Sequence, residues 1–322
     1  GPVPSDQLGR TLMHEHIFLN LIPEFRGQGL LNDPDLMAQE LRDFVQAGGS
    51  TIVELTSAEL TIGASPDPGG HFRGVPDSGY PEHGTRTVNS VLALAEISER
   101  TGVHVILGTG HYRDPYLTDG WLDHRSAAAI AERLVADITE GFPGTTIKAG
   151  IIGEIGADKW YISAVEERSF RAAGRAHRET GVPITTHAAR WPVGVLQLDL
   201  LAEEGVDPAK VIIGHCDGVN IPEYHLAIAQ RGAYVQFDTI RGGSPYDVQM
   251  RVDHVMRLAA AGYLDRILLS QDVCRRDHLR ATGGCGFVYI LNEFRTSLRK
   301  AGLDDCEIEQ LLVANPQRAL TS

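Results

Sequence analysis

The sequence predicts an α/β protein that folds as one (β/α)8 TIM barrel, a single domain over residues 1–322. Eight short runs rich in valine, isoleucine and leucine are spread along the chain, which is typical of parallel strands buried on both faces. Helical patterns separate these runs, and eight strand-plus-helix units in about 300 residues fit a barrel. A doubly wound sheet is the alternative, but no glycine-rich phosphate-binding sequence follows an early strand.

The predicted strands alternate with helices in a regular order. They cover residues 11–16, 50–56, 103–109, 146–155, 182–188, 210–216, 233–239 and 266–272. The helix expected after the fourth predicted strand opens with Ser163 three residues before Glu166, a capping-box pattern, and closes at Gly181. The Pro/Gly-rich stretch 63–84 lies inside the second unit and predicts a long loop on the face that carries the active site.

Composition narrows the class of protein. Hydrophobic residues make up 43% and charged residues 22% of the chain, as in ordinary globular proteins. The formal net charge of −13 disfavours nucleic acid and anionic membrane surfaces as partners, so an anionic substrate would need a local basic pocket. No run approaches the roughly 18 apolar residues of a membrane span. Four cysteines without a CxxC pair, and no recognisable signal peptide, predict a cytoplasmic protein with free thiols.

The first predicted strand carries two histidines, in the stretch TLMHEHIFLN. Residues i and i+2 of a strand point to the same face, so His14 and His16 would project together, about 6–7 Å apart along the backbone. This arrangement suits two nitrogens that bind one metal ion. An exposed strand end with two chance histidines is the alternative.

Polar residues also end most of the other predicted strands. They are His14, His16, Glu54, Thr109, Glu154, His187, His215, Asp238 and Asp272. In a barrel the carboxyl ends of the strands meet at one mouth, where active sites are built. Four histidines and an aspartate at one mouth are hard to explain by packing, and imidazole and carboxylate are the usual ligands of zinc or manganese. The sequence therefore predicts a divalent metal site at the C-terminal mouth.

Two ions about 3.5–4 Å apart would need a bridging ligand, which should be an anionic group on the fourth predicted strand. Lys148, if carboxylated on nitrogen, and Glu154 compete for this role. They have the same strand parity but stand about 20 Å apart, so only one can reach the mouth. Gly156 ends the strand just after Glu154. We therefore expect Glu154 to bridge the ions and Lys148 to lie at the floor of the barrel.

Several segments, in order along nearly the whole chain, carry a family resemblance: TLMHEHIFLN, KAGIIGEIG, PITTHAA, VIIGHCD, GAYVQFDTI and LLSQDVCRRDHLRATGGCGF. They resemble the phosphotriesterase family of the amidohydrolase superfamily, in particular its phosphotriesterase-homology and phosphotriesterase-like lactonase branch. The resemblance implies a (β/α)8 barrel with a dinuclear metal site. The residues that match the family's ligands are His14, His16, His187, His215 and Asp272.

The chain departs from the organophosphate-degrading members at one position. In members with a carboxylated lysine, that lysine directly follows the AGII run; here the position is Gly153, with Glu154 next to it. This fits the glutamate-bridged branch and lowers the expectation of efficient phosphotriester hydrolysis. Relatives are often dimers, so a homodimer is possible.

The expected chemistry is hydrolysis. Two cations that share one water lower its pKa toward neutrality, and Asp272 can take a proton and pass it to the leaving group as the catalytic base. Glu15 is expected to be structural. Glu54 and Asp238 either orient ligand imidazoles through their distal N–H groups or make plain core hydrogen bonds.

Substrate contacts are expected from the loops that follow the strands. Arg241, Arg275 and Arg276 follow the last two strands and could form the local basic pocket, because arginine binds anionic oxygens bidentately; solvated surface arginines are the alternative. Tyr112 resembles the position that seats a lactone, or stabilises its leaving group, in lactonase relatives.

The prediction is thus a metal-dependent hydrolase with two divalent ions, zinc first and manganese or cobalt as alternatives. The favoured substrate is a small lactone that bears a phosphate or a carboxylate. A carboxyl ester, an amide or a phosphoester is the alternative substrate, and a metal-containing binding protein without catalysis is the alternative class. The only partner expected is the small-molecule substrate, with no nucleic acid and no membrane.

Overall fold

The computed structural model describes residues 3–64, 84–117 and 121–321. Eight parallel strands follow one another around a barrel in the order β1-β4-β5-β6-β7-β8-β9-β10. Their bounds are Thr11–Glu15, Thr51–Glu54, His104–Thr109, Ile151–Gly156, Ile184–His187, Val211–Ile213, Tyr234–Phe237 and Ile267–Leu269. The last strand returns to the first, where the amide of Asp272 donates to the carbonyl of His14 at 3.1 Å. The predicted (β/α)8 barrel is confirmed.

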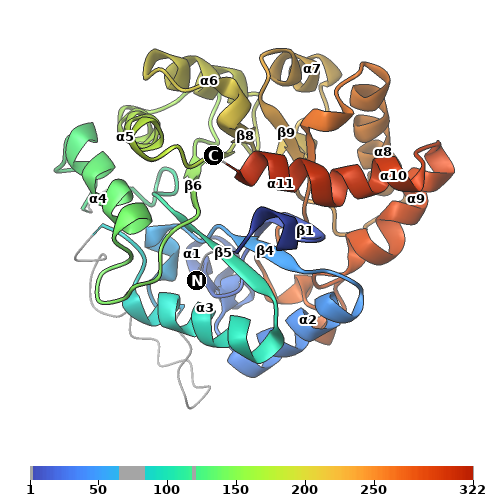
Figure 1. Ribbon diagram of the computed structural model, residues 1–322, viewed down its shortest axis with the longest axis horizontal. Helices are drawn as coiled ribbons and strands as arrows, with labels where there is room; N and C mark the ends of the chain where they lie inside the picture. Colours follow the sequence, from blue (N-terminus) through green and yellow to red (C-terminus); the bar gives the residue numbers. More distant parts are fainter. Residues whose placement is uncertain (1–2, 65–83, 118–120, 322) are drawn as a thin grey trace.

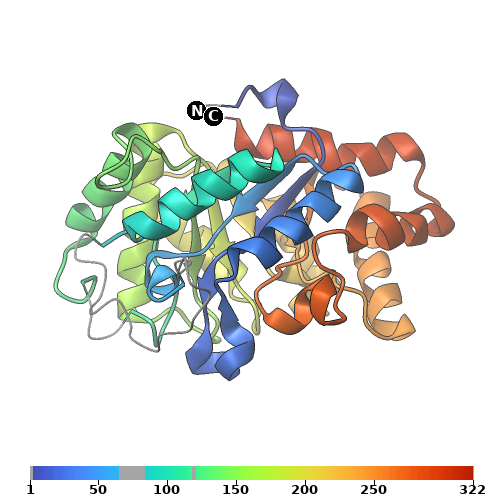
Figure 2. The same cartoon turned by 90° about the horizontal axis from the view of Figure 1, so that it is seen from below.

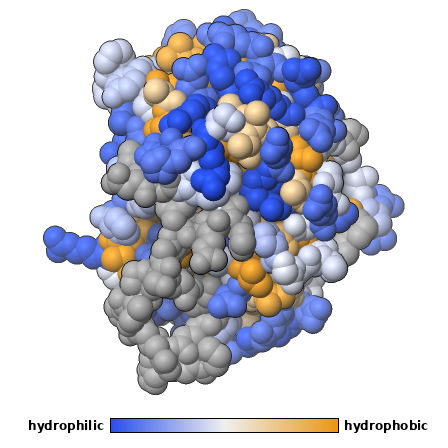
Figure 3. All heavy atoms as spheres, turned by 90° about the vertical axis from the view of Figure 1, so that its left-hand side faces the viewer, coloured by the Kyte–Doolittle hydropathy of each residue, from blue (hydrophilic) through white to orange (hydrophobic). Residues whose placement is uncertain are grey.

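Helices surround the barrel (Figure 1). They are α1 Ile22–Phe25, α2 Pro34–Gln46, α3 Val88–Thr101, α4 Ala127–Thr139, α5 Ala164–Thr180, α6 Gly194–Glu203, α7 Pro222–Gln230, α8 Pro245–Ala260, α9 Arg295–Ala301, α10 Asp305–Glu309 and α11 Asn315–Leu320. A short antiparallel pair, β2 Leu19–Asn20 and β3 Leu30–Leu31, flanks α1 beyond the end of β1. The face that carries α4 and α5 is mainly hydrophilic, with scattered apolar patches (Figure 3). Within the described ranges, no helix has the length and apolar character needed to cross a bilayer.

Both chain termini lie at one end of the barrel, and α1 lies at the other (Figure 2). A buried apolar cluster fills the barrel interior; it comprises Met13, Val53, Leu55, Ile151, Ile212, Tyr234, Leu268 and Ala319. Because Ala319 belongs to α11, this helix covers the amino-terminal end of the barrel (Figure 1). A larger cluster packs the outer faces of the strands against the helices. The packed interior leaves the carboxyl ends of the strands as the open mouth.

Local sequence signals set the ends of the helices. Ser163 and Glu166 form the predicted capping box at the start of α5, and Gly181 ends the helix with a left-handed φ of 76°. Ser126 caps α4 by accepting from the amide of Ala129. These bonds pair backbone groups that a helix end would otherwise leave unsatisfied.

The strands of the second, sixth, seventh and eighth predicted units end two or three residues earlier than expected, and the fourth predicted strand differs most, at its start. The strand expected from residue 146 begins at Ile151, because the preceding segment bonds to the end of α4 and its following turn instead of to the sheet: the amide of Ala149 donates to the carbonyl of Asp137, and Phe142 donates to Ile147. Lys148 therefore precedes the strand and is exposed, so its assignment to the barrel floor was wrong. Most of the long loop expected at 63–84 lies outside the described residues.

Candidate metal centre and active site

All six side chains predicted as metal ligands lie together at the carboxyl ends of the strands. His14 belongs to β1 and Glu154 to β6, and His187 ends β7, while the remaining three residues follow their strands. Two of those three, His215 and Asp272, have left-handed backbones with φ of 55° and 48°. Such conformations cost free energy for residues other than glycine, and they concentrate at functional sites.

The carboxylate of Glu154 is the centre of this group. Its Oε2 lies 3.4 Å from His14 Nε2, 3.0 Å from His187 Nδ1 and 3.4 Å from His215 Nε2. Its Oε1 lies 3.7 Å from His16 Nε2. Burial by itself would raise the pKa of Glu154, but the charge of the nearby His14 holds this pKa well below its ordinary value. One buried carboxylate thus faces all four imidazoles.

The carboxylate of Asp272 approaches the same ring nitrogen of His16 that Glu154 faces. Its Oδ1 is 3.4 Å from His16 Nε2, and its Oδ2 is 3.2 Å from Arg241 Nη1. Arg241 also donates to the backbone carbonyl of Gln271 at 2.7 Å. Burial opposes the charge of Asp272, but the hydrogen bond with His16 and the charge of Arg241 keep its pKa below the ordinary value. Arg241, predicted to contact substrate, is thus directed at the Asp272 carboxylate.

The donor set fits a pair of divalent cations. Two groups of three side chains each bring their ligand atoms to within 4.8 Å of one another. One group is His14, His16 and Asp272, and the other is His14, Glu154 and His215. Within the described ranges, the buried Nε2 atoms of His14 and His187 have no hydrogen-bond partner, a costly state that a metal ion would relieve. Imidazole nitrogens with carboxylate oxygens are suitable ligands for zinc, manganese or cobalt.

Asp238, which directly follows β9, supports two of these imidazoles. Its Oδ1 lies 2.7 Å from His215 Nδ1 and its Oδ2 lies 3.1 Å from His14 Nδ1. If each ring donates its Nδ1–H to this carboxylate, its Nε2 lone pair is directed toward Glu154. Of the two alternatives for Asp238, the contacts favour the orienting role.

Glu54 acts on the site through an intermediary. The hydroxyl of Thr56 donates to Glu54 Oε1 at 2.5 Å, and the hydroxyl oxygen, Thr56 Oγ1, lies 3.0 Å from His16 Nδ1. The hydroxyl hydrogen is already used, so Thr56 can only accept from His16. Glu54 in turn pairs with the buried guanidinium of Arg86 at 2.5 Å. Glu54 therefore fixes Thr56, and Thr56 fixes the imidazole.

Glu15 has the structural role that was expected. Its carboxylate accepts from the amides of Gln271 at 2.7 Å and Val273 at 2.8 Å, and from the hydroxyl of Ser270. Burial raises the pKa of Glu15 to about 7, although these bonds oppose the rise. The three bonds therefore hold the residues that precede and follow Asp272 in the sequence.

The other predicted substrate residues lie around the mouth. The buried ring of Tyr112 packs edge-on against His187, with 5.0 Å between the ring centroids. Arg275 pairs with Asp277, and its guanidinium lies 5.1 Å from the ring of Phe25. Arg276 is partly buried on the same loop. Tyr112 is thus close to the histidine cluster, whereas these two arginines stand farther out.

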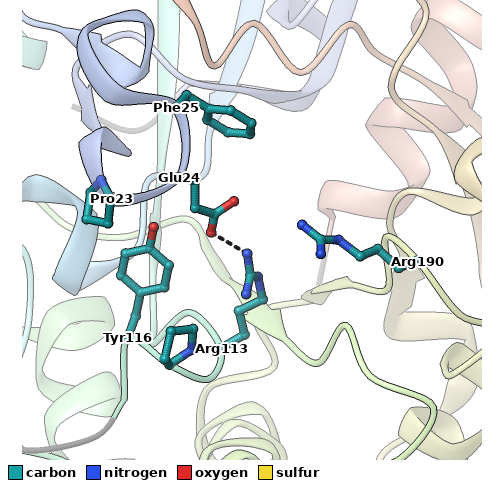
Figure 4. A pocket seen from close by; sticks show the side chains of 7 residues that line it. Pro23, Glu24, Phe25, Arg113, Tyr116 and Arg190 are labelled. Carbon is teal, nitrogen blue, oxygen red and sulfur yellow. Dashed lines mark hydrogen bonds and ion pairs between the residues drawn. The ribbon is translucent and has the colours of Figure 1, made fainter.

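A cavity of about 530 Å³ opens beside Tyr116 (Figure 4), and the centroid of the Tyr116 ring lies 5.3 Å from that of Tyr112. Its lining residues are Pro23, Glu24, Phe25, Arg113, Pro115, Tyr116 and Arg190. The sequence analysis did not select the two arginines of this cavity. Arg113 directly follows Tyr112, and Arg190 follows His187 by three residues, so closeness to a selected strand end was the available signal.

The barrel and the buried cluster of histidines and carboxylates at its mouth together define a metal-site hydrolase of the (β/α)8 class. The chain belongs to the phosphotriesterase family, whose model matches residues 84–320. It is 33% identical to the phosphotriesterase homology protein of Escherichia coli, over 97% of this chain and 98% of the other. A crystal structure of that relative, with phosphate in its active site, has a TM-score of 0.84 at 32% identity and covers 98% and 100% of the two chains.

Two further relatives have named activities. The N-acetyltaurine hydrolase of Mus musculus is 29% identical, over 100% of this chain and 96% of the other. A lactonase structure from Listeria monocytogenes has a TM-score of 0.83 at 25% identity, over 100% and 97% of the two chains. The relatives with named activities are hydrolases, and so is this chain.

Proposed function

We propose that the protein is a dinuclear metal-dependent hydrolase that opens a small lactone bearing a phosphate or a carboxylate. The observation that carries this proposal is the position of Glu154, whose two oxygens face four imidazoles. A buried carboxylate among several imidazoles is suited to bridge two cations. We further propose a cytoplasmic location, which the four free cysteines support.

In this proposal the two cations are held by His14, His16, Glu154, His187, His215 and Asp272, with zinc favoured over manganese and cobalt. When bound, they would supply hydroxide at neutral pH and polarise the scissile carbonyl. Asp272 is the catalytic base. Its Oδ2 is held by Arg241, so Oδ1 is the atom that takes the proton and delivers it to the leaving oxygen.

Tyr112 is proposed to bind the substrate. Burial raises the pKa of its hydroxyl well above the ordinary value, so the phenol stays protonated and can donate a hydrogen bond. Its ring packs against His187 of the cluster, and its hydroxyl interacts with Arg113. A hydrogen bond to the lactone or to the leaving oxygen fits this position.

A negative group on the substrate is proposed from the distribution of charge. The chain has a formal net charge of −13, yet Arg275 and Arg276 lie on the loop that follows β10, at the mouth. The phosphate in the active site of the Escherichia coli relative supports an anionic substrate. Bidentate arginine contacts would supply the local attraction that the whole protein lacks.

An amide is the second candidate substrate. The N-acetyltaurine hydrolases align with this whole chain, and their named substrate is an N-acyl compound. The same nucleophile and the same base would serve an amide, since Asp272 would protonate the leaving nitrogen instead of an oxygen. Substrate shape therefore separates the two candidates better than the catalytic groups do.

The test is a substrate panel with metal-reconstituted protein. Lactones, with and without a phosphate or carboxylate, are compared with N-acyl amino acids, N-acyl aminosulfonates, carboxyl esters and phosphoesters. The proposal expects the highest kcat/KM for an anionic lactone. A higher value for an N-acyl compound would assign the amide function, and bound metal without turnover of any compound would indicate a binding protein.

A further inference from the structure

The cavity beside Tyr116 has the construction of a subsite for part of a substrate. Its walls come from the segment after β1, the segment after β5 and the segment after β7, all at the carboxyl ends of strands. Pro23, Phe25, Pro115 and Tyr116 give it apolar sides. Arg113 and Arg190 give it positive charge, and Glu24, which is paired with Arg113, neutralises part of that charge. Apolar walls with a few convergent polar groups are typical of small-molecule sites.

The cavity is one aromatic ring away from the histidine cluster. The guanidinium of Arg113 lies 5.0 Å from the centroid of the Tyr112 ring, and that ring lies 5.0 Å from His187. A molecule whose reactive bond lies at the cluster could therefore place a group a few atoms away inside this cavity.

Three arginines near the mouth are already paired. Arg113 donates to Glu24, and its Nε lies 3.2 Å from Asp158 Oδ2. Arg241 is bonded to Asp272, and Arg275 is bonded to Asp277. Their charges are largely committed to neighbouring carboxylates.

Arg190 differs from these three. Its side chain is 66% exposed, and its Nε lies 3.6 Å from Asp158 Oδ2, a separation longer than a hydrogen bond. Asp158 is already shared with Arg113. In Figure 4 the guanidinium of Arg190 extends toward the Glu24–Arg113 pair, across the open part of the cavity. Its donors are therefore available to a ligand.

We propose that this cavity binds the negatively charged group of the substrate and that Arg190 is its principal ligand, a specificity-determining residue, whereas Arg275 and Arg276 at the rim attract the anion to the mouth. The inference rests on the proposed hydrolase function and deepens it. The group is an oxyanion, a carboxylate, sulfonate or phosphate, joined to the reactive carbonyl by a short apolar link. Arg113, fixed by Glu24 and Asp158, forms the rigid side of the subsite, while Arg190 closes on the anion in a bidentate contact.

The test compares a γ-lactone that carries a carboxylate side chain with its neutral carboxamide, using metal-loaded protein. In Arg190→Gln, the ratio of kcat/KM for the carboxylate to kcat/KM for the carboxamide should fall about tenfold. This effect is smaller than that of a buried charge-assisted contact, because solvent screens the exposed guanidinium. Arg190→Lys keeps the charge and should recover part of the ratio. Arg178→Gln, an exposed arginine at the far end of α5, is the matched control and should leave the ratio unchanged.

A second readout does not depend on turnover. Propane-1-sulfonate should bind the metal-loaded protein in calorimetry, and Arg190→Gln should weaken this binding about tenfold. If no lactone or amide is hydrolysed while sulfonate binding still depends on Arg190, the proposed function fails and the subsite stands. If Arg190→Gln lowers both lactones equally, or leaves both the ratio and sulfonate binding unchanged, the subsite assignment is overturned.

Discussion

Two groups of buried histidines lie on opposite sides of strand β9. On the inner side, Asp238 contacts the rings of His14 and His215 at the mouth. On the outer side, Phe237 packs against His225 of α7 and His254 of α8, whose own ring centroids are 4.8 Å apart. Successive residues of a strand point to opposite faces, so one strand serves both groups.

The two groups differ in their partners. The outer rings donate to neutral oxygens, His225 to the carbonyl of Cys216 at 2.8 Å and His254 to the side chain of Asn220 at 3.0 Å. Among the described residues, no ion pair joins either outer ring to a carboxylate. At the mouth, Glu154 alone faces four rings. Within the described part of the chain, both groups contain a buried ring nitrogen without a hydrogen-bond partner, Nδ1 of His254 in the outer group and Nε2 of His14 and His187 at the mouth. Clustered histidines are therefore a metal-site candidate only when carboxylates converge on them.

Removal of Glu154 should have the largest effect. Glu154→Ala takes away the proposed bridging ligand, and the loss of several kcal/mol of metal-dependent stabilisation corresponds to about a thousandfold or more in kcat/KM. Elemental analysis of the purified variant should show loss of metal. Lys148→Ala, on the exposed segment before β6, is the control and should retain metal and activity. Full metal content in Glu154→Ala would place the bridge elsewhere.

Asp272→Asn should come next. The amide oxygen can still contact a cation, but it cannot accept a proton, so much of the metal should stay while kcat falls about a hundredfold or more. Arg241 keeps a partner in the backbone carbonyl of Gln271, so the loop should hold its place. Near-normal turnover in this variant would assign the proton transfer to another group.

Asp238→Asn tests the support of the inner rings. The change removes a carboxylate that both His14 and His215 use, so metal affinity should fall about 10- to 100-fold. Competition with a chelator measures this affinity. The matched variant on the outer side, His225→Gln, should leave the affinity unchanged. Equal affinity in both variants would mean that the two histidine groups do not differ as described.

Arg275→Ala tests the rim of the mouth. Its side chain is 33% exposed and already paired with Asp277, so the expected loss is about tenfold in kcat/KM for an anionic lactone. A neutral lactone with the same ring should lose less. An equal loss for both substrates would show that Arg275 supports the loop and does not bind the anion.

His254→Gln should have the smallest effect and should act only on stability. Burial and the neighbouring His225 lower the pKa of His254 to about 4, against about 6.5 in the unfolded chain. Above pH 6.5 His254 is neutral in both the folded and the unfolded chain, so it has no effect on the pH dependence of stability. As the pH falls from 6.5 toward 4, only the unfolded chain gains the proton, so the free energy of unfolding decreases. Urea unfolding at pH 7 and pH 5 should show about 1–2 kcal/mol less acid destabilisation in the variant. An identical pH dependence would contradict the lowered pKa.

Much of the architecture followed from local sequence. Near-continuous apolar runs gave the strands, and the capping box at Ser163 gave the start of α5. His14 and Glu154 could be selected because strand ends converge in a barrel, a rule that needs no knowledge of the loops. Their close approach is a property of the fold class.

Contacts between loops of different units could not be predicted in this way. Arg241 was expected to meet substrate, but its pairing with Asp272 depends on how two loops pack across the mouth. Arg190 was not selected, because nothing near it in the sequence shows that it faces a cavity with Arg113. The alternation of residues along the predicted strand placed Lys148 on the same face as Glu154. The bond from the amide of Ala149 to the carbonyl of Asp137 instead keeps this segment out of the sheet.

The metal content of the wild-type protein tests the central claim most directly. Elemental analysis of protein purified without chelators, or reconstituted with zinc, should give about two divalent ions per chain, the number that the bridged site requires. Removal of these ions with a chelator should abolish hydrolysis, and their return should restore it. Protein that contains no metal under either condition, or whose hydrolytic activity is unchanged by the chelator, would contradict the account.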